Sequence, residues 1–164
     1  DIEFIGVPSI VVDGEAVSSS VIRIAIVSGN CELAAKMLGR NYSIQGVVAD
    51  GEKRGREIGF PTANIKPEFA VTVPDNGIYA TIAEVDGNNH SAATSIGVRP
   101  TFETDGGRTI EAFLLDFDGD VYTKRLRLEF VKRLRSEVAF ETVEQLIEQM
   151  NKDVEQTREI LAKT

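Results

Sequence analysis

The stretch GREIGFPTAN, residues 55–64, is the most informative part of this 164-residue chain. Glycine lets backbone N–H groups approach a phosphate closely, and successive N–H groups can form an anion-binding concavity. Thr62 and Asn64 carry neutral oxygens of the kind that Mg²⁺ accepts beside substrate phosphates. The stretch as a whole therefore predicts a site for phosphate and a hard metal ion. For any single residue in it, a surface turn between two strands is the simpler interpretation.

The sequence around this stretch is rich in β-forming residues. Five segments are expected to be strands, at residues 42–49, 78–85, 90–98, 108–117 and 121–134. Asp-Gly pairs at 86–87 and 118–119 stand where hairpin turns are expected. In the last segment, side chains alternate between two faces with the period of a half-buried strand. Consecutive antiparallel strands followed by one long helix indicate a closed barrel with a helical cover.

A long helix is predicted from Thr142 onward, because the apolar spacing there changes to a helical period. Its expected apolar face contains Val143, Leu146, Ile147, Met150, Val154 and Leu161. Thr142 and Gln145 resemble a capping box. We expect this helix to pack against the sheet as a structural element, with its charged outer face in solvent.

Composition limits the classes of partner. The formal net charge is −8, which argues against a general nucleic-acid binder, because affinity for a phosphate backbone needs a basic face. No apolar run approaches the roughly 20 residues that a membrane span requires. The single cysteine, Cys31, excludes an internal disulfide and is expected to be a packed thiol. It is consistent with a reducing, cytoplasmic location.

Several motifs together resemble the riboflavin kinase family. GREIGFPTAN matches the family signature G-R-x-x-G-[FY]-P-T-A-N, and three further blocks follow in the family's order. These blocks are IGVRPTF at 96–102, IEAFLLDF at 110–117 and LRSEVAF at 134–140. The resemblance implies a mainly β fold, a six-stranded antiparallel Greek-key barrel with a long C-terminal helix. It also implies transfer of the γ-phosphoryl group of ATP to the 5'-hydroxyl of riboflavin, which gives FMN.

The same resemblance implies roles for the reacting groups. Glu111 matches the family's catalytic glutamate, which accepts the hydroxyl proton. The alternation of Ile110, Ala112 and Leu114 places Glu111 on the opposite strand face. From the pattern alone, an ordinary solvent-facing strand glutamate is the simpler interpretation. Thr62 and Asn64 match the family's magnesium ligands.

Substrate-binding positions are expected in three groups. Backbone N–H groups of Gly51, Gly55 and Gly59, with Arg56 as a cation, are expected to hold ATP phosphates. The other ATP-binding positions are Pro61, Thr62, Leu114, Leu115, Asp116 and Tyr122. Thr123 stands where most of the family has glycine, which weakens the inference for Tyr122. The expected flavin-binding positions are Arg135, Val138 and Arg99, although Arg99 could instead pair with a carboxylate.

Residues 1–40 differ in pattern from the rest of the chain. SSSVIR, residues 18–23, resembles the last signature of the FMN adenylyltransferase half of bacterial bifunctional FAD synthetases. We therefore expect residues 1–40 to be the end of that domain with its linker, and residues 41–164 to be the kinase domain. The adenylyltransferase domain is then the expected partner in cis. No adenylyltransferase activity is expected from this polypeptide, because the two-histidine motif needs more than the single histidine present.

Three other functions fit parts of the sequence. A flavin-binding β-barrel could transfer electrons, or act as a regulatory module, without needing Thr62, Asn64 or Glu111. A nucleic-acid-binding small barrel is disfavoured by the acidic charge and the lack of clustered aromatics. Formation of FMN from riboflavin, ATP and Mg²⁺ separates a kinase from all of these.

Overall fold

The computed structural model describes residues 5–6, 8–49, 55, 58–98 and 108–163. Three predicted site residues, Gly51, Arg56 and Arg99, lie outside this described part. Their assignments to ATP and flavin binding therefore stay predictions.

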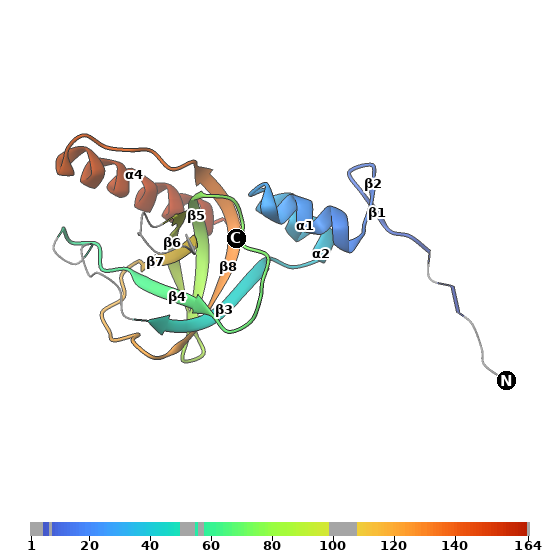
Figure 1. Cartoon of the computed structure of the whole chain (residues 1–164), viewed down its shortest axis with the longest axis horizontal. Helices are drawn as coiled ribbons and strands as arrows, with labels where there is room; N and C mark the ends of the chain where they lie inside the picture. Colours follow the sequence, from blue (N-terminus) through green and yellow to red (C-terminus); the bar gives the residue numbers. More distant parts are fainter. Residues whose placement is uncertain (1–4, 7, 50–54, 56–57, 99–107, 164) are drawn as a thin grey trace.

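Six antiparallel strands form a closed barrel, which confirms the predicted fold class (Figure 1). They are β3 (Tyr42–Ala49), β4 (Ala63–Pro67), β5 (Gly77–Val85), β6 (Asn88–Val98), β7 (Arg108–Leu114) and β8 (Arg125–Arg135). Their order around the barrel is β3-β4-β7-β6-β5-β8. Because β4 pairs with β7, Ala63 and Asn64 at the end of the motif lie beside a strand that follows them by more than forty residues.

The largest differences from the expectation are one missed strand and two strand boundaries. The sequence pattern missed β4, which is only five residues long and begins inside the PTAN motif. Strand β7 ends at Leu114, and β8 begins at Arg125. The chain turns between them, where Asp116 and Thr123 adopt positive φ angles of 54° and 63°. These left-handed conformations end strand pairing, so the residues between the two strands form a loop.

The barrel interior is filled by alternate residues of each strand. The largest fully buried apolar side chains are Tyr79, Phe130, Ile44, Ile96, Leu126, Leu128 and Val48. Two buried polar side chains, Thr81 and Thr94, satisfy each other through a 2.7 Å hydrogen bond between their hydroxyls. Residues on the opposite face of each strand point out of the barrel, and on one side they form the cavity described below.

Helix α4 (Val143–Leu161) lies along the outside of the barrel beside β5, β6 and β8 (Figure 1). Thr142 is its N-cap, and the Gln145 N–H donates to the Thr142 hydroxyl as expected. The Gln145 side chain, however, accepts from the Glu141 N–H. The predicted packing face is partly wrong, because Val143 is 54% exposed and the buried residues of α4 are Asp153 and Thr157.

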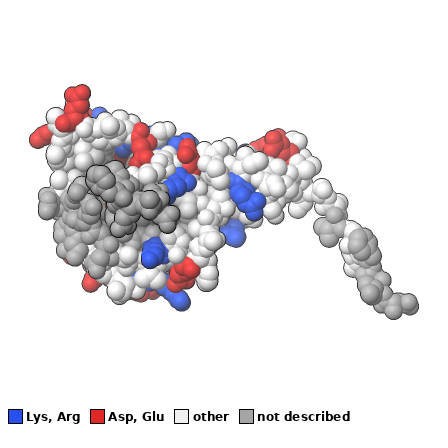
Figure 2. Space-filling view, viewed as in Figure 1, with Lys and Arg blue, Asp and Glu red and all other residues white. Residues whose placement is uncertain are grey.

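The N-terminal part lies at one side of the barrel (Figure 1). It comprises the short strands β1 (Val11–Val12) and β2 (Glu15–Ala16) and the helices α1 (Ser19–Val27) and α2 (Cys31–Leu38). Helix α2 contacts β8 and β3, and its first residue, Cys31, joins the main hydrophobic core. The prediction of a packed thiol is confirmed, and burial raises the pKa of Cys31 to about 12. Acidic and basic side chains are interspersed over the face shown in Figure 2.

Candidate active site

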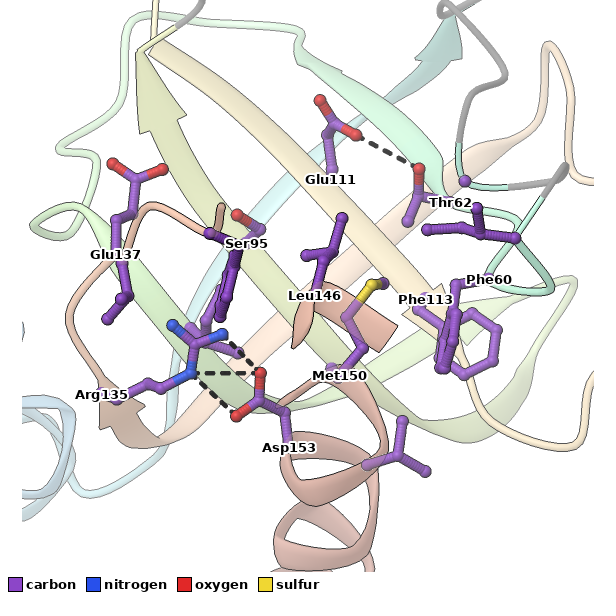
Figure 3. Close-up of a pocket in the computed structure, with 17 residues that line it drawn as sticks. Phe60, Thr62, Ser95, Glu111, Phe113, Arg135, Glu137, Leu146, Met150 and Asp153 are labelled. Carbon is purple, nitrogen blue, oxygen red and sulfur yellow. Dashed lines mark hydrogen bonds and ion pairs between the residues drawn. The ribbon is translucent and has the colours of Figure 1, made fainter. Parts of the chain in front are cut away.

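A cavity of about 360 Å³ lies between the outer face of the barrel and α4 (Figure 3). Strands β5, β6, β7 and β8 supply one wall, and α4 supplies the other. The barrel contributes Ile78, Ala93, Ser95, Glu111, Phe113 and Arg135, and the helix contributes Leu146, Met150, Asp153 and Val154. Helix α4 is therefore a wall of the cavity as well as a cover for the sheet.

The period-two geometry of β7 explains why Glu111 faces this cavity. Ile110 and Ala112 are buried inside the barrel, so Glu111 and Phe113 point outward. The outward face here is covered by α4 and the 136–140 segment, so Glu111 lines a cavity. The simpler interpretation, a strand glutamate facing open solvent, does not describe its position.

Thr62 and Glu111 are in direct contact. The Thr62 hydroxyl donates to the Glu111 carboxylate, with 3.2 Å between Oγ1 and Oε2. In the β4–β7 ladder, Asn64 is the residue opposite Glu111. Thr62 immediately precedes β4, and Asn64 is its second residue. Both side chains point out of the barrel, whereas that of Ala63 between them is buried. The Glu111 carboxylate and two neutral side chains with oxygen atoms that can bind a metal ion thus lie together on one outer face of the barrel.

A second cavity, of about 370 Å³, lies beside the first, and Thr62 lines both. It is lined by Pro61, Thr62, Ala63, Leu114, Phe117, Asp118, Gly119, Asp120, Val121 and Tyr122. Four of the predicted ATP-binding residues therefore line one cavity: Pro61, Thr62, Leu114 and Tyr122. Residues 117–122 form its other side and include two carboxylates, those of Asp118 and Asp120.

Four predicted ATP-binding residues of the described part do not line this second cavity: Gly55, Gly59, Leu115 and Asp116. Leu115 is buried, with 4% of its surface exposed. The Asp116 carboxylate faces α4, where its Oδ1 accepts a 2.8 Å hydrogen bond from Arg158 Nη2. The Arg158 guanidinium lowers the pKa of Asp116. The side chain of Leu115 is therefore part of the packed interior, and that of Asp116 is engaged by Arg158.

The glycines of the motif shape its turn. The Phe60 N–H donates to the Gly55 carbonyl at 2.7 Å, and a Cβ added to Gly55 would lie 2.2 Å from the Phe60 carbonyl oxygen. Gly59 has a φ of +87°, which side-chain-bearing residues rarely adopt. This tight turn places Gly55, Phe60 and Thr62 on the rim of the first cavity.

An ion pair closes the opposite end of the first cavity. Arg135 Nε lies 2.9 Å from Asp153 Oδ1, and Arg135 Nη2 lies 2.7 Å from Asp153 Oδ2. Gln149 also donates to Asp153 Oδ1, at 3.0 Å. The Arg135 guanidinium stands 6.0 Å from the centre of the Phe140 ring. Arg135 and Val138, both predicted to bind flavin, line this cavity.

The sequence interpretation missed Asp153. The signal was available, because Asp153 falls on the helical stripe that also holds Leu146, Met150 and Thr157. An acidic residue on an otherwise apolar packing face indicates a specific partner. That partner, Arg135, could not be identified from helical spacing alone.

Comparisons with known proteins identify the family of this chain. Residues 38–161 match the family model described as "Flavokinase: Riboflavin kinase". The chain is 44% identical over 139 residues to the bifunctional riboflavin kinase/FMN adenylyltransferase of Bacillus subtilis, covering 84% of this chain and 44% of that protein. It is 40% identical over 149 residues to the same enzyme of Listeria monocytogenes, covering 91% and 48%. The chain thus spans about half the length of the curated relatives that it matches.

Solved structures share the fold. The crystal structure of riboflavin kinase from Trypanosoma brucei is similar with a TM-score of 0.54 and 26% identity, over 74% of this chain and 80% of that one. A structure described as a macrolide-efflux protein from Streptococcus pneumoniae gives a TM-score of 0.87 and 35% identity, over 93% and 50%. In the described part of this chain, no helix combines the length and apolar character needed to cross a membrane.

Proposed function

We infer that this chain, which belongs to the riboflavin kinase family, transfers the γ-phosphoryl group of ATP to the 5'-hydroxyl of riboflavin. The observation that carries the proposal is the Thr62–Glu111 hydrogen bond, because Thr62 lines two cavities and Glu111 lines one of them. Phosphoryl transfer needs one site for the donor, one for the acceptor, and a proton acceptor between them. This arrangement offers all three.

Riboflavin fits the first cavity in size and character. Cavities for small molecules commonly measure about 300–1,000 Å³ and combine apolar walls with a few polar groups. Phe60 and Phe113 pack edge to face, with ring centres 5.2 Å apart, and line the cavity together. They offer a flat aromatic flavin a rigid apolar wall. Glu111 faces the same space, where it can meet the hydroxyl at the end of the ribityl chain.

ATP is assigned to the second cavity. Its phosphates would extend toward Thr62, where the turn formed by Gly55 and Gly59 offers backbone N–H groups. The adenosine end would lie between Leu114 and Tyr122. This direction brings the γ-phosphate to the junction of the two cavities, beside Glu111.

Glu111 is proposed to accept the proton of the riboflavin 5'-hydroxyl. As that proton moves to the carboxylate, the hydroxyl oxygen forms a bond to the γ-phosphorus. The bond between the γ-phosphorus and the bridging oxygen of ADP then breaks, and ADP keeps the electron pair. The hydrogen bond from Thr62 holds the carboxylate at the junction, so that no reorientation is needed when the hydroxyl arrives.

Thr62 and Asn64 are the residues that would hold Mg²⁺. Mg²⁺ commonly takes few protein ligands and completes its shell with water and substrate phosphates, so two neutral oxygens fit it when nucleotide is present. When bound, the ion would neutralise charge that develops on the phosphates. Among the described residues, no group of three or more His, Cys, Asp and Glu side chains is placed to hold a metal ion.

Residues 41–164 are proposed to be the kinase module, and residues 1–40 to belong with an adenylyltransferase half. The bifunctional names of the relatives, of which this chain spans about half, support this division. An adenylyltransferase domain in cis is then the proposed partner. The 164-residue polypeptide should form no FAD from FMN and ATP, and detection of FAD by chromatography would contradict the division.

The direct test is to incubate the protein with riboflavin, ATP and Mg²⁺ and to separate the products by chromatography. A kinase produces FMN and ADP in equal amounts. The alternative, a flavin-binding barrel with an electron-transfer or regulatory role, would quench riboflavin fluorescence but leave no FMN. Absence of FMN with intact flavin binding would therefore replace the proposed function with this alternative.

A further inference from the structure

Phe117 is a wall residue of the second cavity and lies beyond the end of a strand. Strand β7 ends at Leu114, and the Leu115 N–H still donates to the Ser91 carbonyl of β6, at 2.8 Å. At Asp116 the chain then turns with a φ of 54°. Because Phe117 follows this turn in a loop, the place of its ring in the cavity wall depends on side-chain packing.

His90 supplies one of the packing contacts of Phe117. The two rings meet edge to face, with their centres 4.9 Å apart and their planes at 77°. Aromatic rings prefer this geometry to a face-to-face stack. The contact joins the beginning of β6 to the loop that follows β7, and both lie at the same end of the barrel (Figure 1). A side chain of one strand thus supports the wall of a cavity that is built mainly by another segment.

The period of β6 explains how His90 reaches this ring. The alternate residues of β6 that face the barrel interior are Ala92, Thr94 and Ile96. His90 lies on the same face, two residues before Ala92. Because β6 begins at Asn88, this position is at the end of the barrel, where the His90 side chain is half-buried. An imidazole suits such a place, since it combines a flat ring for packing with nitrogen atoms that can face water.

The Phe117 ring is also confined by its own loop and by the barrel core. A Cβ added to Gly119 would lie 2.8 Å from Phe117 Cζ, so the ring rests against the Gly119 backbone. Phe117 packs in addition against the main hydrophobic core. Together with the His90 ring, these contacts restrict the rotamers of Phe117. Removing the imidazole would open a space into which the Phe117 ring can turn.

We propose that His90 is a positioning residue for the nucleotide and that it acts through Phe117. This proposal rests on the proposed function, because it takes ATP as the ligand of the second cavity. His90 is not among the described residues that line that cavity, whereas Phe117 is. The imidazole holds the Phe117 ring in the wall on which the adenosine end of ATP rests. A wall that is formed before the ligand arrives spares the nucleotide the cost of ordering it.

Steady-state kinetics of FMN formation test this role. His90→Ala should raise the KM for ATP about three- to tenfold, because the Phe117 wall is no longer held in place. The kcat and the KM for riboflavin should stay within about twofold, because Glu111 and the first cavity are unchanged. His90→Phe keeps a ring at this position and should restore the KM for ATP. The matched control is Asn89→Ala, at an exposed position on the opposite face of β6, which should change none of these values.

An unchanged KM for ATP in His90→Ala, or equal increases in both KM values, would overturn the proposal. If His90→Ala does not fold, His90→Leu, which keeps a side chain of similar size without a flat ring, should show the same increase. Calorimetric titration with ADP repeats the comparison without turnover, and ADP should bind His90→Ala about three- to tenfold more weakly. Failure of the unmodified protein to form FMN would contradict the proposed function. Normal FMN formation with an unchanged KM for ATP in His90→Ala would contradict only the role of His90.

Discussion

The hydroxyl of Thr62 and the carboxylate of Glu111 are 3.2 Å apart, although 49 positions separate them in the sequence. The contact exists because β4 and β7 are neighbours in the closed barrel, with Ala63 opposite Ala112 and Asn64 opposite Glu111. Two cavities share Thr62 at this point. The proposed chemistry depends on this one pairing of strands.

Replacing Glu111 with Gln should remove the proton acceptor while keeping the shape of the cavity. A positioned base commonly contributes about 10²–10⁴-fold, and the turnover number for FMN should fall by that order. Riboflavin binding should change little. As a control, Glu84→Gln alters an outward-facing strand glutamate on β5 that lies outside both cavities. Near-normal turnover of Glu111→Gln would remove this residue from the mechanism.

Filling the first cavity should weaken riboflavin binding without weakening ATP binding. Ala93 is a small residue on the barrel wall of that cavity, and Ala93→Phe places a ring in the space assigned to the flavin. We expect riboflavin affinity to fall at least about tenfold, because overpacking a formed site forces its walls apart. ATP affinity should stay within about twofold. Asn89→Phe, an exposed position on the same strand, is the matched control. Equal weakening of ATP binding would show that the two cavities do not hold separate substrates.

Magnesium binding should depend on nucleotide. Thr62 and Asn64 offer two neutral oxygens, which are too few ligands to hold the ion alone, and the phosphates of ATP would supply the rest. Calorimetry should detect no tight Mg²⁺ binding to the protein alone, and a clear signal when a non-hydrolysable ATP analogue is present. Thr62→Val should weaken the second signal. Tight binding to the nucleotide-free protein would contradict this assignment.

The β3–β4 pairing should tolerate no side chain at Gly46. A Cβ added there would lie 2.4 Å from the Lys66 carbonyl oxygen and 2.7 Å from an Ile65 methyl group. Because backbone atoms must move to make room, Gly46→Ala should lower the free energy of unfolding by about 1–3 kcal/mol. Gln45→Ala, an exposed position on the same strand, should cost far less. Urea unfolding followed by circular dichroism measures both, and equal stability of the two variants would refute the close approach.

Stability should decrease at alkaline pH through Cys31. Burial raises its pKa from 9.0 to about 12 in the folded chain, so the unfolded chain loses the thiol proton first. The contribution of the protonated thiol to the free energy of unfolding is complete below pH 9.0 and is lost as the pH rises toward about 12. Between pH 8 and about 10.5 the thiol should account for about 2 kcal/mol of lost stability. Urea titrations of Cys31→Ala should show a decline that is smaller by this amount. An equal decline in both proteins would mean that the thiol is not shielded from solvent.

Much of the local structure, and the candidate residues for the proposed chemistry, could be predicted from the sequence. Alternation along 110–114 placed Glu111 on the face opposite Ile110 and Ala112, and the structure confirms this face. The start of the last helix was readable because Thr142 caps it. These features depend on backbone periodicity and on hydrogen bonds between near neighbours, which a sequence displays directly.

The contacts between residues far apart in the chain could be identified only from the folded structure. Strand β4 is too short to show a clear alternation, and it becomes a strand by pairing with β3 and β7. No local pattern shows that Asp153 binds Arg135, or that Thr62 lines two cavities at once. Those contacts arise from barrel closure and from the docking of α4, which depend on packing between segments far apart in the chain.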